Sequence, residues 1–122
     1  MLVALHSWSA DYRQKESVIY GEWATANDWV LIHPNFRGPN TKPQATGSEL
    51  VIGDVLSAID YAKANARVDE SRIYAVGWSG GGYLGTEASV RWIEPTKETI
   101  TIAIDQGATD MSQRSLLKEI IK

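Results

Sequence analysis

The sequence contains no cysteine, no basic excess and no long apolar run. Without cysteine there is no disulfide framework, no thiolate zinc site and no cysteine nucleophile. A net charge of -3 disfavours nucleic acid and anionic membranes as partners. No stretch approaches the roughly 20 apolar residues of a membrane span, and the first residues lack a signal-peptide pattern. We therefore expect a soluble, cytoplasmic protein, although a truncated sequence would lack its leader.

The 122 residues suffice for one domain and are too few for two. Short apolar runs predict strands at Leu2 to Leu5, Trp29 to Ile32, Ile73 to Val76 and Ile100 to Ile104. Helical patterns occur at residues 16–26, 46–66, 80–92 and 112–121. This alternation predicts an α/β fold of three layers, with a mainly parallel sheet of about four strands between helices.

Two of these elements carry additional signals. Thr46 and Glu49 match a capping box, which predicts that the second helix begins at Thr46. The last strand alternates threonine with isoleucine and alanine, a pattern that suits a less buried position at the edge of the sheet. The segment from Pro34 to Pro43 is predicted to be a loop because it is rich in turn-forming residues.

The segment Gly77-Trp78-Ser79-Gly80-Gly81 fits the pattern Gly-x-Ser-x-Gly between a predicted strand and a predicted helix. A tight turn of this kind lifts a serine hydroxyl into the open and requires small neighbours. Ser79 is therefore a candidate nucleophile, and the N–H of Gly80 is a candidate donor to an oxyanion. The alternative is a glycine-rich turn whose serine only caps the helix.

Glycines of the same segment also fit a dinucleotide-binding fingerprint. Gly80, Gly82 and Gly85 have the required spacing and follow a strand, and Asp105 stands at a later strand end where a ribose-binding acid is expected. Against this interpretation, the fingerprint begins as its strand ends, and Trp78 and Ser79 intervene here.

With its flanking motifs, the serine turn resembles the α/β-hydrolase superfamily, and within it the prolyl-oligopeptidase-like peptidases and esterases. The supporting motifs are Leu5-His6-Ser7-Trp8, Asn35-Phe36-Arg37-Gly38 and Asp69-Glu70-Ser71-Arg72-Ile73. The resemblance implies the strand order 2-1-3-4, which brings the ends of the first and third strands together. It also implies that the N–H of Ser7 or Trp8 completes the oxyanion hole, although Ser7 stands where glycine is usual. No cofactor or metal is required.

The sequence does not decide which residues would act as the base and the acid of a catalytic triad. His6 has three interpretations: an organiser of its loop, a general base or a core histidine. In the superfamily the acid and then the histidine follow the serine. After Ser79 the sequence has Asp105 and Asp110 as weak acid candidates but no histidine.

Arg37 is expected to order its loop through backbone carbonyls, or else to be a solvated loop residue.

The resemblance also implies that residues 1–122 form a single, partial α/β-hydrolase domain, a truncated central portion. Unpaired sheet edges then predict a homo-oligomer. The primary hypothesis is a serine hydrolase, either a carboxylesterase or peptidase-like, that acts on a small ester or peptide substrate. Its activity is expected to be weak, and esters are favoured because no gating domain is present. The alternatives are a non-catalytic, self-associating α/β module and a dinucleotide-binding domain.

Overall fold

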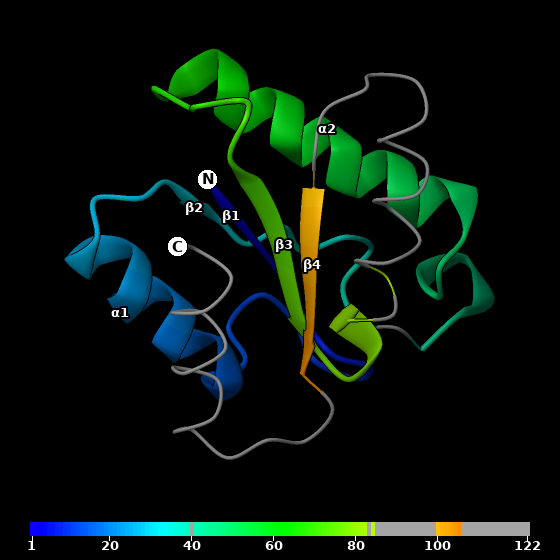
Figure 1. Ribbon diagram of the computed structural model, residues 1–122. Helices are drawn as coiled ribbons and strands as arrows, with labels where there is room; N and C mark the ends of the chain where they lie inside the picture. Colours follow the sequence, from blue (N-terminus) through cyan, green and yellow to red (C-terminus); the bar gives the residue numbers. More distant parts are fainter. Residues whose placement is uncertain (40, 83, 85–99, 106–122) are drawn as a thin grey trace.

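The computed structural model describes residues 1–39, 41–82, 84 and 100–105 (Figure 1). Within these ranges one parallel sheet has the order β2-β1-β3-β4. Its strands are β1 (Leu2–Leu5), β2 (Leu31–Ile32), β3 (Ile73–Trp78) and β4 (Ile100–Asp105). The helices are α1 (Val18–Ala26) and α2 (Glu49–Asn65), preceded by the short 3-10 helices η1 (Lys15–Ser17) and η2 (Pro43–Ala45). The predicted α/β class is confirmed.

The apolar run of β1 supplies both faces of the sheet, because successive side chains of a strand point in opposite directions. Val3 and Leu5 belong to the buried cluster that includes residues of α2. Leu2 and Ala4 belong to a second cluster, which includes Tyr20 of α1. The two helices therefore cover opposite faces of the sheet (Figure 1). This arrangement explains why every residue of β1 is buried.

Helix α2 begins later than the sequence indicates. Its N-cap is Ser48, whose hydroxyl accepts a hydrogen bond from the N–H of Val51 at 3.4 Å. Thr46 instead follows η2, and its hydroxyl donates to the carbonyl of Lys42 at 3.0 Å. The predicted capping box at Thr46 is wrong because the chain forms the separate turn η2 before the helix starts.

The remaining boundaries differ by small amounts. The first helix is preceded by η1, and β2 is shorter than the predicted Trp29 to Ile32. In contrast, β3 continues two residues past the predicted end at Val76, to Trp78. The helix predicted over residues 80–92 begins at residue 80, but most of it and the helix predicted over residues 112–121 lie outside the described residues. None of the described helices has the length and apolar character needed to cross a membrane.

The carboxyl ends of β1 and β3 lie next to each other at the centre of the sheet. Leu5 pairs with Gly77 in the parallel register. From β1 the chain goes first to β2 on one side and later to β3 on the other, so the strand order reverses at this point. Ligands of open α/β sheets bind at such a reversal, outside the carboxyl ends of the strands.

Candidate active site

Ser79 lies in the turn that follows β3. Its φ of 49° is in the left-handed region, which is unusual for a residue with a side chain. The residue is exposed, and helical structure begins directly after it at residue 80. Within the described part of the chain, no hydrogen bond is formed by its hydroxyl. The strained turn therefore presents an uncommitted hydroxyl at the carboxyl end of the central strands.

The glycines on either side of Ser79 allow backbone segments to approach closely. A side-chain carbon on Gly77 would collide with the carbonyl carbon of Gly81 and lie 2.7 Å from the amide nitrogen of Gly82. A side-chain carbon on Gly81 would collide with the carbonyl oxygen of Leu5 and lie 2.8 Å from that of His6. The turn is thus packed against the end of β1 through backbone alone, which only glycine permits.

Gly80 is covered by the indole of Trp8. A side-chain carbon on Gly80 would lie 2.5 Å from Cδ2 and Cε2 of that ring. Trp8 is 36% exposed, whereas Gly80 is buried. The loop after β1 and the turn after β3 are therefore in direct contact, as the resemblance to hydrolases implies.

His6 is buried within its loop. Its ring is 0% exposed and stacks on Phe36, with the ring centroids 3.9 Å apart and the planes 4° from parallel. Nδ1 lies 3.0 Å from the carbonyl oxygen of Ser7. A carbonyl can only accept a hydrogen bond, so Nδ1 carries the proton and Nε2 is the acceptor. Nε2 is buried and has no hydrogen-bond partner, and burial lowers the pKa of His6 below its usual 6.5.

A chain of hydrogen bonds holds the loop of His6 in place. The N–H of Ser7 donates to Oε1 of Gln14 at 2.8 Å, and Nε2 of Gln14 donates to the hydroxyl of Ser17 at 3.1 Å. That hydroxyl lies 3.4 Å from Nε2 of His33, whose pKa is lowered to about 4 by burial and then by His6. Because Gln14 occupies the amide of Ser7, this amide could donate to an oxyanion only if the bond to Gln14 broke. The N–H of Ser7 or Trp8 as an oxyanion donor stays a prediction.

Sequence patterns did not single out Gln14. It belongs to no motif and stands seven residues after Ser7, to which it is bound. The loop folds back through a turn in which the N–H of Ala10 donates to the carbonyl of Ser7 at 3.2 Å. A polar residue that becomes a partner only after such a turn leaves no periodic signal.

Two of the other predicted residues can be placed. Asp105 ends β4 opposite Trp78, next to the residue that precedes the serine. Among the described residues, Arg37 binds no backbone carbonyl. Its Nε lies 2.7 Å from Oδ2 of Asp54, so it joins the loop after β2 to α2. Asp110 lies outside the described residues.

The packing of the glycines does not favour the dinucleotide interpretation. A phosphate-binding turn needs glycines whose open side faces the ligand. Of the fingerprint glycines, Gly80 is covered by Trp8 and Gly82 is buried, and Gly85 lies outside the described residues. Within the described ranges, no group of three or more histidine, aspartate and glutamate residues could hold a metal ion.

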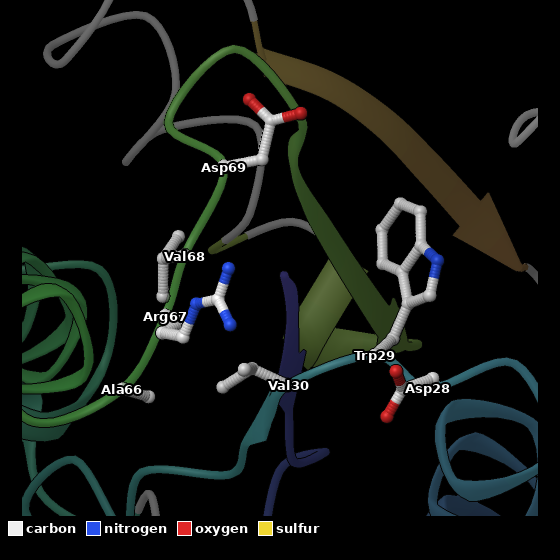
Figure 2. Close-up of a pocket in the computed structure, with 7 residues that line it drawn as sticks. All are labelled: Asp28, Trp29, Val30, Ala66, Arg67, Val68 and Asp69. Carbon is white, nitrogen blue, oxygen red and sulfur yellow. The ribbon is translucent and has the colours of Figure 1, made fainter.

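A wide cavity lies at the opposite, amino end of the sheet. It has a volume of about 1000 Å³ and is lined by Asp28, Trp29, Val30, Ala66, Arg67, Val68 and Asp69. These residues belong to the segments that lead into β2 and β3, with Arg67 directed into the space between them (Figure 2). No nucleophile or histidine is among them, so this cavity does not contribute to the candidate active site.

Comparison with protein-family models gives a match. The model of the prolyl oligopeptidase family matches residues 20–92, more than half of the 122 residues. The matched segment includes Ser79 and its flanking glycines and begins after the loop of His6. Searches of curated proteins and of solved structures found no match.

Proposed function

Because the chain belongs to the prolyl oligopeptidase family, we propose that it is a serine hydrolase in which Ser79 attacks the carbonyl carbon of an ester or amide. The observation that carries this proposal is the left-handed φ of 49° at an exposed serine. Conformational strain of this kind persists only where the surrounding structure imposes it, and it is concentrated at functional sites. Here the surrounding glycines impose it.

Attack by Oγ would place negative charge on the former carbonyl oxygen. Gly80 is the first helical residue after the serine, and the first N–H groups of a helix have no partner within the helix. We assign the N–H of Gly80 as one donor to the oxyanion. The second donor is proposed to be the N–H of Trp8, because Trp8 contacts Gly80 and the amide of Ser7 is bound to Gln14.

The base that removes the serine proton is proposed to come from outside residues 1–122, from another segment or another chain. His33 is engaged with Ser17, and His6 is buried and stacked on Phe36. His6 fits the role of a loop organiser, since its Nδ1–H donates to the carbonyl of Ser7. Its unpartnered Nε2 would have to leave this buried position to reach an exposed hydroxyl.

Esters are proposed as better substrates than amides. An alkoxide leaves a tetrahedral intermediate more readily than an amine, which must first be protonated. Without a histidine beside Ser79 among the described residues, the proton that an amine needs depends entirely on the external base, whereas an activated ester does not need this proton. Activated esters should therefore be hydrolysed first.

Labelling with a fluorophosphonate tests the proposed nucleophile. The unmodified protein should be labelled at Ser79, and Ser79→Ala should lose labelling completely because only the hydroxyl is removed. His6→Asn is the matched variant: its side-chain N–H can still donate to the carbonyl of Ser7, but the imidazole is gone. Labelling by His6→Asn at more than about a tenth of the original rate supports an external base, because loss of a general base costs at least about a hundredfold. Absence of labelling in the unmodified protein would refute the hydrolase.

The strain at Ser79 gives a second readout that does not depend on activity. Ser79→Gly should raise the unfolding free energy by about 1 kcal/mol, since glycine adopts positive φ without steric cost. Ser79→Ala keeps its side-chain carbon and should leave stability nearly unchanged. Urea unfolding followed by tryptophan fluorescence would measure both variants. Equal stability of Ser79→Gly and Ser79→Ala would show that the turn is not strained.

A second candidate function is a non-catalytic α/β module. It is favoured by one observation, the absence of any histidine after Ser79 in the sequence. In this case Ser79 would retain its turn geometry as an inherited feature. An unlabelled but strained serine, seen as stabilisation by Ser79→Gly without fluorophosphonate labelling, would favour this candidate.

A further inference from the structure

Arg67 and Asp28 line the same cavity at the amino end of the sheet, which has a volume of about 1000 Å³. Both residues are exposed. Within the described part of the chain, neither side chain forms an ion pair or a hydrogen bond, with the other or with a third residue. The cavity thus has one guanidinium and one carboxylate that are free to bind a ligand.

The neighbouring charges are already engaged. Oδ1 of Asp69 accepts hydrogen bonds from the N–H of Ser71 at 3.0 Å and from its hydroxyl at 2.6 Å. The guanidinium carbon of Arg72 lies 4.8 Å from the centre of the Trp29 ring, a cation–π contact. The Met1 ammonium donates to the carbonyl of Arg72 at 2.6 Å. These contacts leave the two groups described above as the uncommitted charges of the cavity.

The two free charges lie on opposite sides of the cavity (Figure 2). Arg67 belongs to the segment between α2 and β3, and Asp28 to the segment between α1 and β2. The half-buried Trp29, Val30 and Val68 add apolar surface to the lining. A cavity of this volume can hold a small organic molecule, and this one offers it a cation, an anion and apolar contacts.

The backbone on both sides of the cavity is held in place. Nζ of Lys63 lies 2.7 Å from Oε2 of Glu70, so an ion pair joins the chain before and after residues 66–69. On the other side, the N–H of Trp29 donates to the carbonyl of Ala24 at 2.8 Å, which ties the segment to the end of α1. A site whose walls are set before binding loses less entropy when the ligand arrives.

We propose that this cavity binds a small zwitterion, a molecule with an ammonium group, a carboxylate and an aliphatic part, such as an amino acid or a short peptide. The guanidinium of Arg67 donates hydrogen bonds to the carboxylate, and the carboxylate of Asp28 accepts them from the ammonium. A simple anion would leave Asp28 without a partner and facing a like charge. The site is separate from Ser79 and does not depend on the proposed function.

A titration of isotope-labelled protein followed by heteronuclear NMR tests this proposal. The ligands are leucine, leucyl-leucine, isocaproate, which lacks the ammonium group, and isoamylamine, which lacks the carboxylate. At least one zwitterion should shift the amide signals of residues 28–30 and 66–69 without shifting those of Ser79 and Gly80. Each single-charge analogue should bind about two- to fivefold more weakly than leucine, the range expected for one exposed ion pair. The tighter of the two zwitterions identifies an amino acid or a peptide as the ligand.

Two substitutions assign the charges. Arg67→Gln should weaken the tighter zwitterion about two- to fivefold and leave isoamylamine unchanged, because only the partner of the carboxylate is removed. Asp28→Asn should weaken the same zwitterion to a similar extent without weakening isocaproate. Arg13→Gln and Asp60→Asn are the matched controls, since both change exposed charges outside the cavity, and neither should alter binding.

The proposal is overturned if neither zwitterion shifts the signals of residues 28–30 and 66–69, or if the single-charge analogues bind as tightly as leucine. It is also overturned if Arg67→Gln and Asp28→Asn bind as the unmodified protein does. Fluorophosphonate labelling of Ser79 should be the same in both variants as in the unmodified protein. A failure at this cavity is therefore distinguishable from a failure of the proposed hydrolase.

Discussion

The two ends of the sheet differ in how closely the chain approaches itself. At the carboxyl end, Gly77 meets the backbone of Gly81 and Gly82, and Gly81 meets the end of β1, so closely that neither position has room for a side chain. At the amino end, a cavity of about 1000 Å³ separates the segments that lead into β2 and β3. Charged residues such as Arg67 and Asp69 line it and are exposed. This cavity thus lies at the end of the sheet away from Ser79, the proposed nucleophile.

This contrast separates the volume of a cavity from the constraint that the proposed nucleophile needs. A reactive serine needs a fixed position and amides directed at the developing charge, and both come from close backbone contact. The amino end has open space and solvated charges but no such constraint. The close contacts at the carboxyl end therefore support the proposed site at Ser79.

Gly81→Ala should destabilise the protein more than any other substitution at either end of the sheet. Its new carbon would collide with the carbonyl oxygen of Leu5, and backbone there cannot move without disturbing β1. Overpacking against backbone should cost about 3 kcal/mol. Urea unfolding followed by tryptophan fluorescence would measure the loss.

Gly53→Ala is the matched control for this change. Gly53 lies inside α2, and a side-chain carbon there would have no neighbour within 4 Å. Alanine should therefore stabilise the helix by about 0.5–1 kcal/mol. If Gly81→Ala were as harmless as Gly53→Ala, the carboxyl end would not be tightly packed and the contrast between the two ends would disappear.

The fold and the serine turn could be predicted from the sequence because both have local signals. Apolar runs indicate the strands, and Gly-x-Ser-x-Gly between a strand and a helix indicates the turn at Ser79. The start of α2 was misplaced because Thr46 and Ser48 are both good caps, and only the extra turn η2 selects Ser48. Local propensity does not distinguish two caps that are two residues apart.

The contacts around His6 could not be predicted because they join residues from different loops. Phe36 stacks on His6 from the loop after β2, and Gln14 reaches Ser7 after the chain has turned back. Arg37 was expected to bind carbonyls, but Asp54 on α2 provides an acceptor of opposite charge. Such partners become neighbours only when the sheet has formed.

Gln14→Met should have a smaller effect than Gly81→Ala and should act mainly on reactivity. It removes the acceptor for the N–H of Ser7 and the donor to Ser17, so the loop of His6, which also contains Trp8, is no longer held by these hydrogen bonds. An unpaired amide costs about 1–3 kcal/mol, so stability should fall by about 1 kcal/mol and fluorophosphonate labelling at Ser79 should slow several-fold.

Gln14→Glu separates the two bonds of Gln14, since a carboxylate still accepts from Ser7 but cannot donate to Ser17. It should restore most of the labelling rate. Gln44→Met changes an exposed glutamine on η2 and should leave the labelling rate unchanged. Equal labelling rates in Gln14→Met and Gln44→Met would mean that the hydrogen bonds of Gln14 to the loop of His6 do not affect the reactivity of Ser79.

The smallest predicted effect is a difference in pH dependence between the two ends of the sheet. At the carboxyl end, burial and then His6 lower the pKa of His33 from 6.5 to about 4. The unfolded chain therefore binds a proton that the folded chain does not, and stability should fall as the pH decreases from 6.5 to 4. Burial lowers the pKa of His6 in the same direction.

At the amino end the dependence should lie mainly outside this range. Burial lowers the pKa of the Met1 amino group from 8.0 to about 6, so stability should fall as the pH decreases from 8 to 6. Asp69 acts at lower pH. Hydrogen bonds from Ser71 lower the pKa of Asp69 below 3.8, so its contribution is complete above that pH and is lost only as the pH falls further. His33→Gln should therefore reduce the slope of unfolding free energy between pH 6.5 and 4, whereas Asp69→Asn should leave this slope unchanged. An unchanged slope in His33→Gln would show that His33 is as well solvated in the folded protein as in the unfolded chain.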